Sequence, residues 1–552
     1  MTTIILHFLL FFLVAFFNGY FFLNFFNKHD LNNNFFGISL IGIVITGLFA
    51  QFINFFIPLS DYVIYFNLLF ISVLFILNKK LFKIKFEINY LFILPVFLLV
   101  ILNIYGSKFS DDLNHYHYSY ILNTDNFNYI IGLNHLQWHF GLSSLWLITH
   151  SYFNFDYSRL QDIHVLNGLI LFLTLSLFLS EIVLSFKKKN INIYVPTIFL
   201  ILIFILIKYS RLKEFGIDRP TFLLFYFLIY FYIKNFFINK KQYNNNNIYI
   251  LTILCIAIIF IKITFAFIII LPLYFFLIDK QLSLLLNKKI ILVGTICIIY
   301  FTKNFLISGC LIYPIEFLCF ESLSWSNNQA VIWKNQTLQL IMKFWPSYTG
   351  VLSEYEYLKN FNWFKTWLSR ILIELLEFFT TSLLALFITL LSFNFTEKFK
   401  SKFNQNFSAN KSREITTVLS IVLFFCLMVF LFKSPVIRMF HHIFILASII
   451  PLILLIQKRK VKMKNNFIIF FLVLAFLFNG SKNLIRIKDN NFINNPKRQV
   501  YLEGLHRKST QFKIDNFFYY RGWLGPSPTG NSNLDGYNHK KILFFNMIYK
   551  RK

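Results

Sequence analysis

The sequence has few charged residues for its length. Asp, Glu, Lys and Arg make up 14% of the 552 residues, whereas hydrophobic residues make up 57%. A soluble domain carries roughly 25% charged residues, most of them on its surface. This composition therefore excludes an ordinary soluble protein and indicates a multi-pass integral membrane protein whose surface faces lipid.

Acidic residues are the scarcest charged type, at 24 against 53 Lys and Arg. In a soluble protein the net charge of +29 would suggest a nucleic-acid partner. Here the lysines gather in short blocks between apolar segments, as expected where positive charge keeps loops in the cytoplasm. We therefore expect membrane lipid as a partner and no nucleic acid.

Motifs of soluble enzymes are missing as well. The sequence has no P-loop, no GxSxG, no HExxH and no glycine-rich dinucleotide turn. The N-terminus has no basic segment before its apolar run and no small-residue cleavage site, so we expect it to stay as the first membrane span. None of the five cysteines forms a CxxC metal pair. Cys310 and Cys319 share a polar loop, and an oxidising compartment would let them form a disulfide.

Apolar segments that match a spanning helix of about 20 residues are abundant. We predict an all-α integral membrane protein with about 12–14 transmembrane helices. The apolar run 248–278 is too long for one span, and Lys262 near its middle predicts a tight hairpin of two short helices. The other spans are predicted at 3–23, 35–57, 60–78, 88–105, 162–185, 191–208, 221–238, 290–306, 368–393, 415–432, 441–456 and 466–480.

Loop charge predicts which side each loop occupies. Alternate threading of the spans puts six lysine-rich blocks on one side, which is then the cytoplasm. The opposite side receives the loops 106–161, 208–220, 307–367 and 433–440, and the tail from Ser481. These loops are long and chemically mixed, so we expect function there.

Loop 106–161 holds the first candidate groups, Asp111 and Asp112, six residues after a predicted span. A carboxylate that is partly desolvated at the membrane boundary has its neutral form favoured, which suits it to take a proton from a hydroxyl. The alternatives are a solvated pair of loop residues or a helix cap for the segment that follows. Later in the loop, Leu142 to Phe153 predicts an interfacial helix along the outer membrane surface.

Four histidines follow the two aspartates: His115, His117, His135 and His139. His135 and His139 have the i, i+4 spacing of a helical metal site, and so do Asp111 and His115. Histidine is also an ordinary residue at membrane interfaces. We expect these four side chains to hydrogen-bond a polar substrate, and we predict no cofactor, with a divalent metal as the alternative.

Two groups of cations lie on the outer side, against the topological preference. We expect Arg211, Arg219 and Arg438 to bind an anion there, and a lipid phosphate or diphosphate is the anion most available. For the first group, salt bridges to Glu214 and Asp218, or snorkelling of the side chains to headgroups, are the alternative. The groups are Lys208, Arg211, Lys213 and Arg219 in segment 208–220, and Lys433 and Arg438 in segment 433–440.

This arrangement resembles the GT-C superfamily of polytopic membrane glycosyltransferases. Its members place an acidic residue in the first large extracytoplasmic loop, directly after a span. Asp111 and Asp112 occupy that place if 88–105 is the equivalent of the first core helix. The resemblance then divides the chain into accessory transmembrane helices (1–87), a GT-C-like core (88–480) and a small extracytoplasmic tail (481–552).

The chain is more similar still to a group of uncharacterised bacterial inner-membrane proteins with a GT-C-like N-terminal part. Their pattern has an acidic residue five before the His of a Tyr-His pair, then Gly-Leu…Leu-His-Gly-Arg, Phe-Asn-Ser-Ser, Ser-Gly…Tyr-Pro and Pro-x-x-Arg elements. Gln137 and His139 stand where the pattern has His and Arg, and Ser143 where it has Asn. The matching residues are Asp112, Tyr116, His117, Gly132, Leu133, Leu136, Phe140, Gly141, Ser144, Ser308, Gly309, Tyr313, Pro314, Pro435 and Arg438.

The resemblance implies a transferase that moves a sugar from a polyprenyl-phosphate donor to an acceptor hydroxyl at the outer face of a bacterial inner membrane. Asp112 would be its general base, with Asp111 as helper. A polysaccharide polymerase or ligase, and a transporter of lipid-linked saccharides, are the alternatives. The substrate-binding residues would be His115, His117, His135, His139, Arg211, Arg219 and Arg438.

Overall fold

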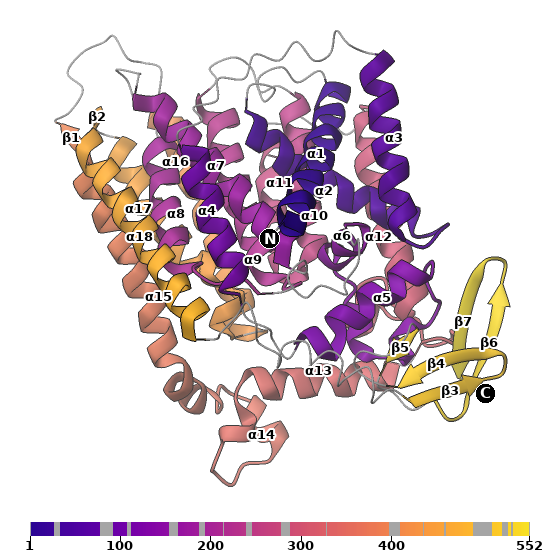
Figure 1. Cartoon of the computed structure of the whole chain (residues 1–552). Helices are drawn as coiled ribbons and strands as arrows, with labels where there is room; N and C mark the ends of the chain where they lie inside the picture. Colours follow the sequence, from indigo (N-terminus) through magenta and orange to yellow (C-terminus); the bar gives the residue numbers. More distant parts are fainter. Residues whose placement is uncertain are drawn as a thin grey trace.

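The protein is a bundle of helices with two small sheets near the C-terminus (Figure 1). The computed structural model describes residues 2–26, 34–77, 92–107, 112–153, 164–186, 194–213, 215–238, 245–277, 287–326, 328–396, 409–433, 435–457, 460–489, 510–521, 528–530 and 534–550. The α-helices within these residues are α1 (Thr2–Phe25), α2 (Phe35–Ile53), α3 (Asp61–Leu77), α4 (Ile93–Tyr105), α5 (Tyr118–Asn126), α6 (Leu145–Tyr152), α7 (Val165–Phe186), α8 (Tyr194–Lys208), α9 (Asp218–Ile233), α10 (Asn245–Ile261), α11 (Ile270–Leu277), α12 (Lys289–Ser308), α13 (Asn328–Met342), α14 (Glu354–Leu358), α15 (Phe364–Ser392), α16 (Ala409–Phe432), α17 (His441–Gln457) and α18 (Asn465–Asp489).

Each predicted span coincides with one or more of these helices. Among the described residues, α1, α2, α7, α12, α15, α16 and α18 are long and apolar enough to cross a membrane. Several other helices, such as α4, α8 and α17, are apolar but shorter. The protein is thus a mainly helical membrane protein, and the total of about 12–14 spans stays a prediction.

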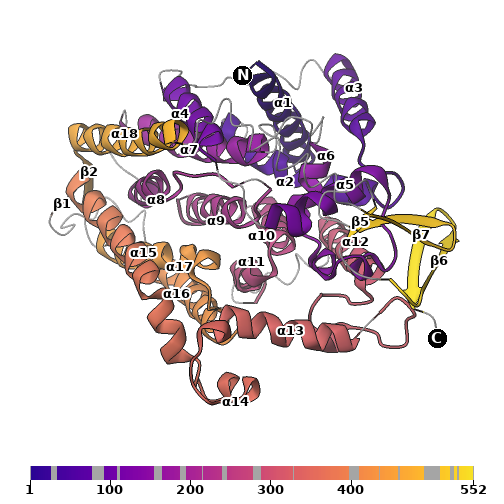
Figure 2. The same ribbon diagram turned by 60° about the horizontal axis from the view of Figure 1, so that its bottom comes forward.

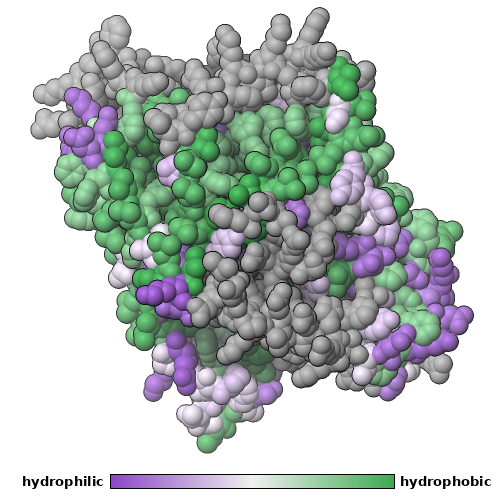
Figure 3. All heavy atoms as spheres, in the orientation of Figure 1, coloured by the Kyte–Doolittle hydropathy of each residue, from purple (hydrophilic) through white to green (hydrophobic). Residues whose placement is uncertain are grey.

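Helices that are hydrophobic all round lie in the middle of the bundle. Figure 2 shows α8, α9 and α10 surrounded by the other helices, and nearly all of their residues are buried. Outer helices instead expose hydrophobic residues, such as Ile373 and Phe387 on α15. Figure 3 shows hydrophobic residues over the helical part of one face and hydrophilic ones gathered on the tail strands and at the lower edge. This pattern is what a lipid-facing surface requires.

The run 248–278 forms the predicted hairpin. α10 ends at Ile261, and Lys262 adopts an extended conformation (φ −150°, ψ 108°) before the 3-10 helix η8 (Ile263–Ile269). η8 and α11 then return along α10, with Cys255 Sγ 3.6 Å from the Ile268 carbonyl oxygen. The charge on Lys262 is therefore placed at the turn and not inside a continuous helix.

Two expectations for the helices need correction. The helix predicted along the membrane surface is α6, but all eight of its residues are buried, because it packs between α2 and α5. The boundary at 480 falls inside α18, which continues to Asp489. It continues because Asn479 and Asn483 find hydrogen-bond partners on α4, where Asn103 Nδ2 lies 3.1 Å from Asn479 Oδ1.

The tail adds short strands that the prediction of an all-α membrane protein did not include. Two sheets form there, one from β3 (Thr510–Ile514), β4 (Phe517–Arg521) and β5 (Thr529–Gly530), and one from β6 (Tyr537–Ile542) and β7 (Phe545–Lys550). β7 also hydrogen-bonds to loop 106–161. The backbone N–H of Ile548 donates to the carbonyl oxygen of Ile131, and the backbone N–H of Ile131 donates to the carbonyl oxygen of Asn546. A further small sheet joins β1 (Phe393–Thr396) to β2 (Lys460–Met463).

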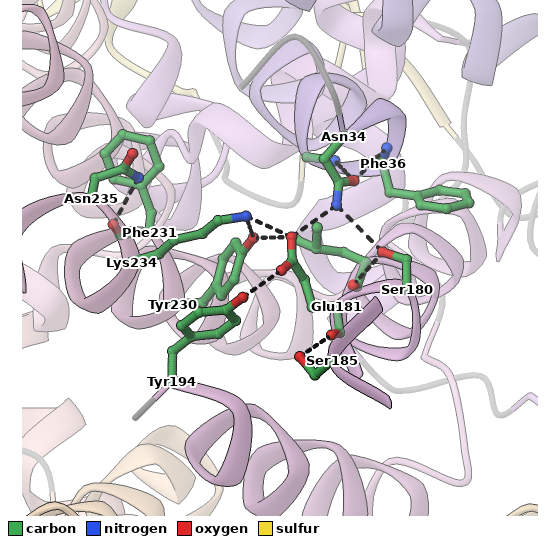
Figure 4. A network of polar contacts seen from close by, with 12 residues as sticks. Asn34, Phe36, Ser180, Glu181, Ser185, Tyr194, Tyr230, Phe231, Lys234 and Asn235 are labelled. Carbon is green, nitrogen blue, oxygen red and sulfur yellow. Dashed lines mark hydrogen bonds and ion pairs between the residues drawn. The ribbon is translucent and has the colours of Figure 1, made fainter. Parts of the chain in front are cut away.

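A buried carboxylate connects four helices (Figure 4). Glu181 on α7 accepts hydrogen bonds from Asn34 before α2, from Tyr194 on α8 and from Tyr230 on α9. Lys234, just after α9, places its ammonium 2.6 Å from the same carboxylate. Burying this charge is tolerated because every oxygen has a partner.

We expect Glu181→Ala to destabilise the protein by about 3–5 kcal/mol, since it leaves the Lys234 charge and two tyrosine hydroxyls without their acceptor. The thermal unfolding midpoint in detergent, followed by fluorimetry, measures this. Glu181→Gln should cost less because it keeps one acceptor oxygen. Glu354→Ala, at an exposed carboxylate in α14, is the matched control with a change under about 1 kcal/mol. An unchanged midpoint in Glu181→Ala would contradict this role.

Cys310 and Cys319 form a disulfide in the loop that follows α12, which agrees with the predicted outer position because disulfides persist in oxidising compartments. In Cys310→Ser the partly exposed Cys319 thiol becomes free. We expect a membrane-impermeant maleimide to label it in right-side-out spheroplasts, and to label the wild type only after reduction. Labelling that requires lysis would place this loop in the cytoplasm.

Candidate functional site

Asp112 lies after α4, one residue before the π-helical turn η3 (Leu113–His117). Its carboxylate faces Arg438 in the turn η13 (Ile437–Met439), with 4.0 Å between Asp112 Oδ2 and Arg438 Nη2. The two side chains are 38% and 48% exposed, so solvent reaches both. Asp112 is therefore more exposed to water than we expected for a carboxylate at the membrane boundary. An ion pair this open contributes at most about 1 kcal/mol, so a charged ligand can displace it.

Asp218, the first residue of α9, is already paired. Lys262 Nζ lies 2.5 Å from Asp218 Oδ1, and these side chains are 7% and 24% exposed. Asp218 also interacts electrostatically with Arg219 and with Lys213, so it balances part of the positive charge beside it in addition to the charge of Lys262. Glu214, the other carboxylate of the salt-bridge alternative, lies outside the described residues.

Lys213 lies between the two acidic groups and the arginines. It interacts electrostatically with Arg438, Asp218, Arg219 and Asp112. Burial lowers the pKa of Lys213, and the positive charges of Arg438 and Arg219 lower it further. An anion bound here would offset both effects, because it would stabilise the ammonium. Three loops that are far apart in sequence thus bring acidic and basic groups to one place.

His117 lies at the inner wall of this site and is buried. Neither of its ring nitrogens has a hydrogen-bond partner among the described residues. Burial lowers its pKa to about 4, although the negative charges of Asp112 and Asp218 oppose the shift. The imidazole is therefore neutral near pH 7, with one nitrogen to donate and one to accept a hydrogen bond.

The other site residues predicted in loop 106–161 lie in two different parts of the structure. His139 stacks on Tyr116, with 4.5 Å between ring centres, so it lies beside the segment that carries Asp112 and His117. His135 instead packs against Tyr537 of β6, 4.8 Å between ring centres, and belongs to the junction with the tail. The structure does not bring it to Asp112 as a substrate contact. Asp111 and the His115 side chain lie outside the described residues.

Arg211 and Arg219 gather with Arg486, which the sequence analysis did not single out. Arg211 and Arg486 both interact electrostatically with the Arg219 guanidinium. The sequence offered no signal for Arg486, because it was assigned to the tail and lies more than 200 positions further along the chain.

Lys303 was not among the residues singled out from the sequence, although a lysine inside the apolar span 290–306 indicates a buried charge with a specific partner. It is fully buried on α12, and its Nζ donates to the Ser143 carbonyl oxygen at 2.8 Å. This contact holds the segment that contains Gly141. A Cβ atom added at Gly141 would lie only 2.8 Å from Cδ1 of Tyr313, so the Tyr313 ring packs directly on this glycine. Two elements of the resemblance, near 141 and 313, are thus in direct contact.

Metal binding has no support in the part of the chain that the structure describes. No group of three or more His, Cys, Asp or Glu side chains there is placed to hold a metal ion. The i, i+4 pair His135 and His139 does not form such a site, because 3-10 turns replace the continuous helix that the spacing assumed.

A family model described as "Domain of unknown function (DUF8201)" matches residues 1–445. The protein belongs to the DUF8201 family. No curated protein and no solved structure matches the chain. The DUF8201 match includes Asp112, Lys213, Asp218, Lys262 and Arg438, and it begins with the helices that we expected to be accessory. It ends within α17, before Arg486 and the tail strands.

The depressed pKa of His117 predicts a pH effect on the stability of this DUF8201 protein. The unfolded chain takes up a proton near pH 6.5 and the folded protein only near pH 4. The contribution of His117 is therefore complete above about pH 6.5 and is lost as the pH falls towards 4.

We expect His117→Asn to reduce the loss of stability between about pH 6.5 and 5 by about 2 kcal/mol relative to the wild type. Thermal unfolding in detergent at both pH values measures it. Other buried histidines titrate in both proteins, so the difference isolates His117. An unchanged pH dependence would mean that the imidazole is solvated or charged in the folded protein.

Proposed function

We propose that this DUF8201 protein is a membrane glycosyltransferase of the GT-C type. It transfers a sugar from a polyprenyl-phosphate donor to an acceptor hydroxyl at the outer face of a bacterial inner membrane. The observation that carries the proposal is the position of Asp112, within 4.0 Å of Arg438 and beside Lys213. A carboxylate next to two cations provides a base and a phosphate site in one place.

The cations would bind the donor phosphate. Arg438 is half exposed, so a phosphate can reach it and replace Asp112 as its partner. Arginine holds phosphate oxygens with two parallel hydrogen bonds, which favours this exchange. Lys213 is near enough to interact with Arg438 and would share the charge of the phosphate.

Phosphate binding would release Asp112 for proton transfer. The acceptor hydroxyl gives its proton to the Asp112 carboxylate while its oxygen forms a bond to C1 of the sugar. The bond from C1 to the phosphate oxygen breaks, and its electron pair stays on the phosphate. Arg438 and Lys213 stabilise that growing negative charge.

The neutral imidazole of His117 would orient the substrate. Both ring nitrogens are buried without a partner among the described residues, and burying an unpaired polar atom costs about 1–3 kcal/mol. Two sugar hydroxyls, one that donates to the unprotonated nitrogen and one that accepts from the N–H group, would remove this cost. Sugars offer many such hydroxyls, which favours a saccharide substrate.

The alternative functions have less support. A polysaccharide polymerase or ligase would use the same outer arginines and histidines, but Asp112 would be dispensable. A transporter needs charged residues within the spans that bind and release a ligand. Glu181 and Lys262 are instead paired with protein groups, at 2.6 Å and 2.5 Å, which suits fixed structural charges.

We expect Asp112→Asn to lower sugar transfer by about 10²-fold or more, because the amide cannot accept the proton. Membranes supplied with a radiolabelled polyprenyl-phosphate sugar provide the assay. Asp125→Asn is a matched control in the same loop, since its carboxylate accepts a hydrogen bond from Ser151 that an amide oxygen can keep. Full activity in Asp112→Asn and Asp111→Asn, singly and combined, would rule the mechanism out. Loss of activity only in arginine or histidine variants would favour the polymerase or ligase.

A further inference from the structure

The hairpin formed by β6 and β7 ends in an apolar turn. Ile542 pairs with Phe545, so Leu543 and Phe544 form the two-residue turn between the strands. Leu543 is 84% exposed, and Ile542 and Phe544 are exposed as well. Figure 1 and Figure 2 both show this hairpin at the edge of the molecule. Contiguous apolar residues exposed in this way mark a contact with a protein or a membrane.

The other hairpin of the tail has a turn of the same length with polar residues. Ile514 pairs with Phe517, so Asp515 and Asn516 form that turn between β3 and β4. The first turn residue has a left-handed backbone in both hairpins, with φ 51° at Asp515 and 54° at Leu543. Aspartate tolerates this conformation, whereas leucine is strained in it. Turn geometry therefore does not explain the apolar residues of the β6–β7 turn, which indicate apolar surroundings.

The β6–β7 turn continues a surface of exposed apolar residues on the bundle. The Phe544 ring lies 6.4 Å from the ring of Phe56, which follows α2 and is itself exposed. Phe52 in the last turn of α2 and Phe66 on α3 are exposed too. α2 is long and apolar enough to cross a membrane, and α3 is apolar but shorter. Because the bilayer surrounds such helices, the β6–β7 turn lies where the end of α2 leaves the bilayer.

Two lysines precede the β6–β7 turn. Lys540 and Lys541 lie on β6 and are exposed, and the Lys540 ammonium lies 5.1 Å from the centre of the Tyr549 ring on β7. Tyrosine is enriched at the depth of lipid headgroups, and lysine there is attracted to anionic lipids. The hairpin thus changes from cationic to apolar towards its tip, which suits an element that enters a bilayer from water.

We propose that the β6–β7 turn inserts into the bilayer that surrounds the protein. Leu543 and Phe544 lie in the apolar region of the lipid, and Lys540 and Lys541 bind the headgroup phosphates. The occupant is the membrane itself, because the turn continues the apolar surface of the helices and carries the charge that complements anionic headgroups. This proposal is independent of the proposed sugar transfer.

Insertion would hold part of the candidate site at the membrane. β7 hydrogen-bonds to Ile131 through the backbone of Ile548 and of Asn546. Ile131 lies in loop 106–161, the loop that carries Asp112. The hairpin therefore connects this loop to the lipid surface, in addition to the helices on either side of it.

A fluorophore on the β6–β7 turn tests the proposal. Leu543→Cys is made in the full-length protein with the free cysteines Cys255, Cys297 and Cys426 changed to alanine. The protein is labelled with a nitrobenzoxadiazole dye and placed in nanodiscs of phosphatidylcholine and phosphatidylglycerol. We expect lipids with a nitroxide near the headgroup end of the acyl chain to quench the dye, and aqueous iodide not to, because an inserted side chain lies about 5–10 Å into the boundary. Asn516→Cys, in the polar turn of the other hairpin, is the matched control and should show the reverse.

Loss of the leucine side chain tests the connection to loop 106–161. Leu543→Ala removes few contacts with the protein, because Leu543 is mostly exposed, and alanine keeps the Cβ that strains the left-handed backbone. We expect the backbone amides of Ile131 and Ile548 to exchange hydrogen at least about threefold faster in nanodiscs, since full burial of a leucine would contribute more than about tenfold. Mass spectrometry measures the exchange. Asn516→Ala is the control and should leave both rates unchanged.

Three results would contradict these expectations. Quenching of the Leu543 label by iodide and not by the lipid nitroxide would place the turn in water and overturn the proposal. Protection from both quenchers would also overturn it, since protein would then cover the turn, and protection limited to nanodiscs with two copies of the chain would identify a second copy as that cover. Unchanged exchange at Ile131 and Ile548 in Leu543→Ala would refute the connection to loop 106–161.

Discussion

The ion pair between Lys262 and Asp218 determines how the end of the protein that carries the candidate site is arranged. Lys262 interrupts the apolar run 248–278 and is buried at the turn of the hairpin. A buried ammonium needs a partner, and it takes the carboxylate at the first residue of α9. Asp218 also interacts electrostatically with Lys213 and Arg219, so the pair lies within the group of cations at this end of the protein. The same pair also fixes the start of α9 and, with it, the loop that carries Arg211 and Lys213.

A second ion pair fixes the other end of α9. Lys234 follows this helix and binds Glu181 of α7, which also accepts hydrogen bonds from α8 and α9. A helix that is apolar on every side has no preferred face, so packing alone does not determine its position along the axis of the bundle. The two ion pairs, one at each end of α9, determine that position. The two buried ion pairs thus hold α9 in position. Asp112 and Arg438 are instead exposed to solvent, where a substrate can reach them.

The site combines residues from segments that have little else in common. Asp112 and His117 come from loop 106–161, Lys213 and Arg219 from the loop before α9, and Arg438 from the turn before α17. Their convergence is the basis for the proposed glycosyl transfer. The DUF8201 match covers all five of these residues.

The sequence alone predicted the apolar helices, the hairpin at Lys262 and the groups of cations in segments 208–220 and 433–440. These properties are local, because hydropathy over about 20 residues and the charge of short loops decide them. Only the tertiary structure decided that Asp218 forms an ion pair with Lys262, that His135 packs on Tyr537 away from Asp112, and that Arg486 lies close to Arg219. Such pairings depend on which helices lie side by side, and contacts between residues 44 to more than 400 positions apart leave no periodic signal in the chain. The tail strands were missed as well: β6 and β7 pair with each other, and the backbone of loop 106–161 holds β7 at Ile131, contacts that hydropathy does not predict.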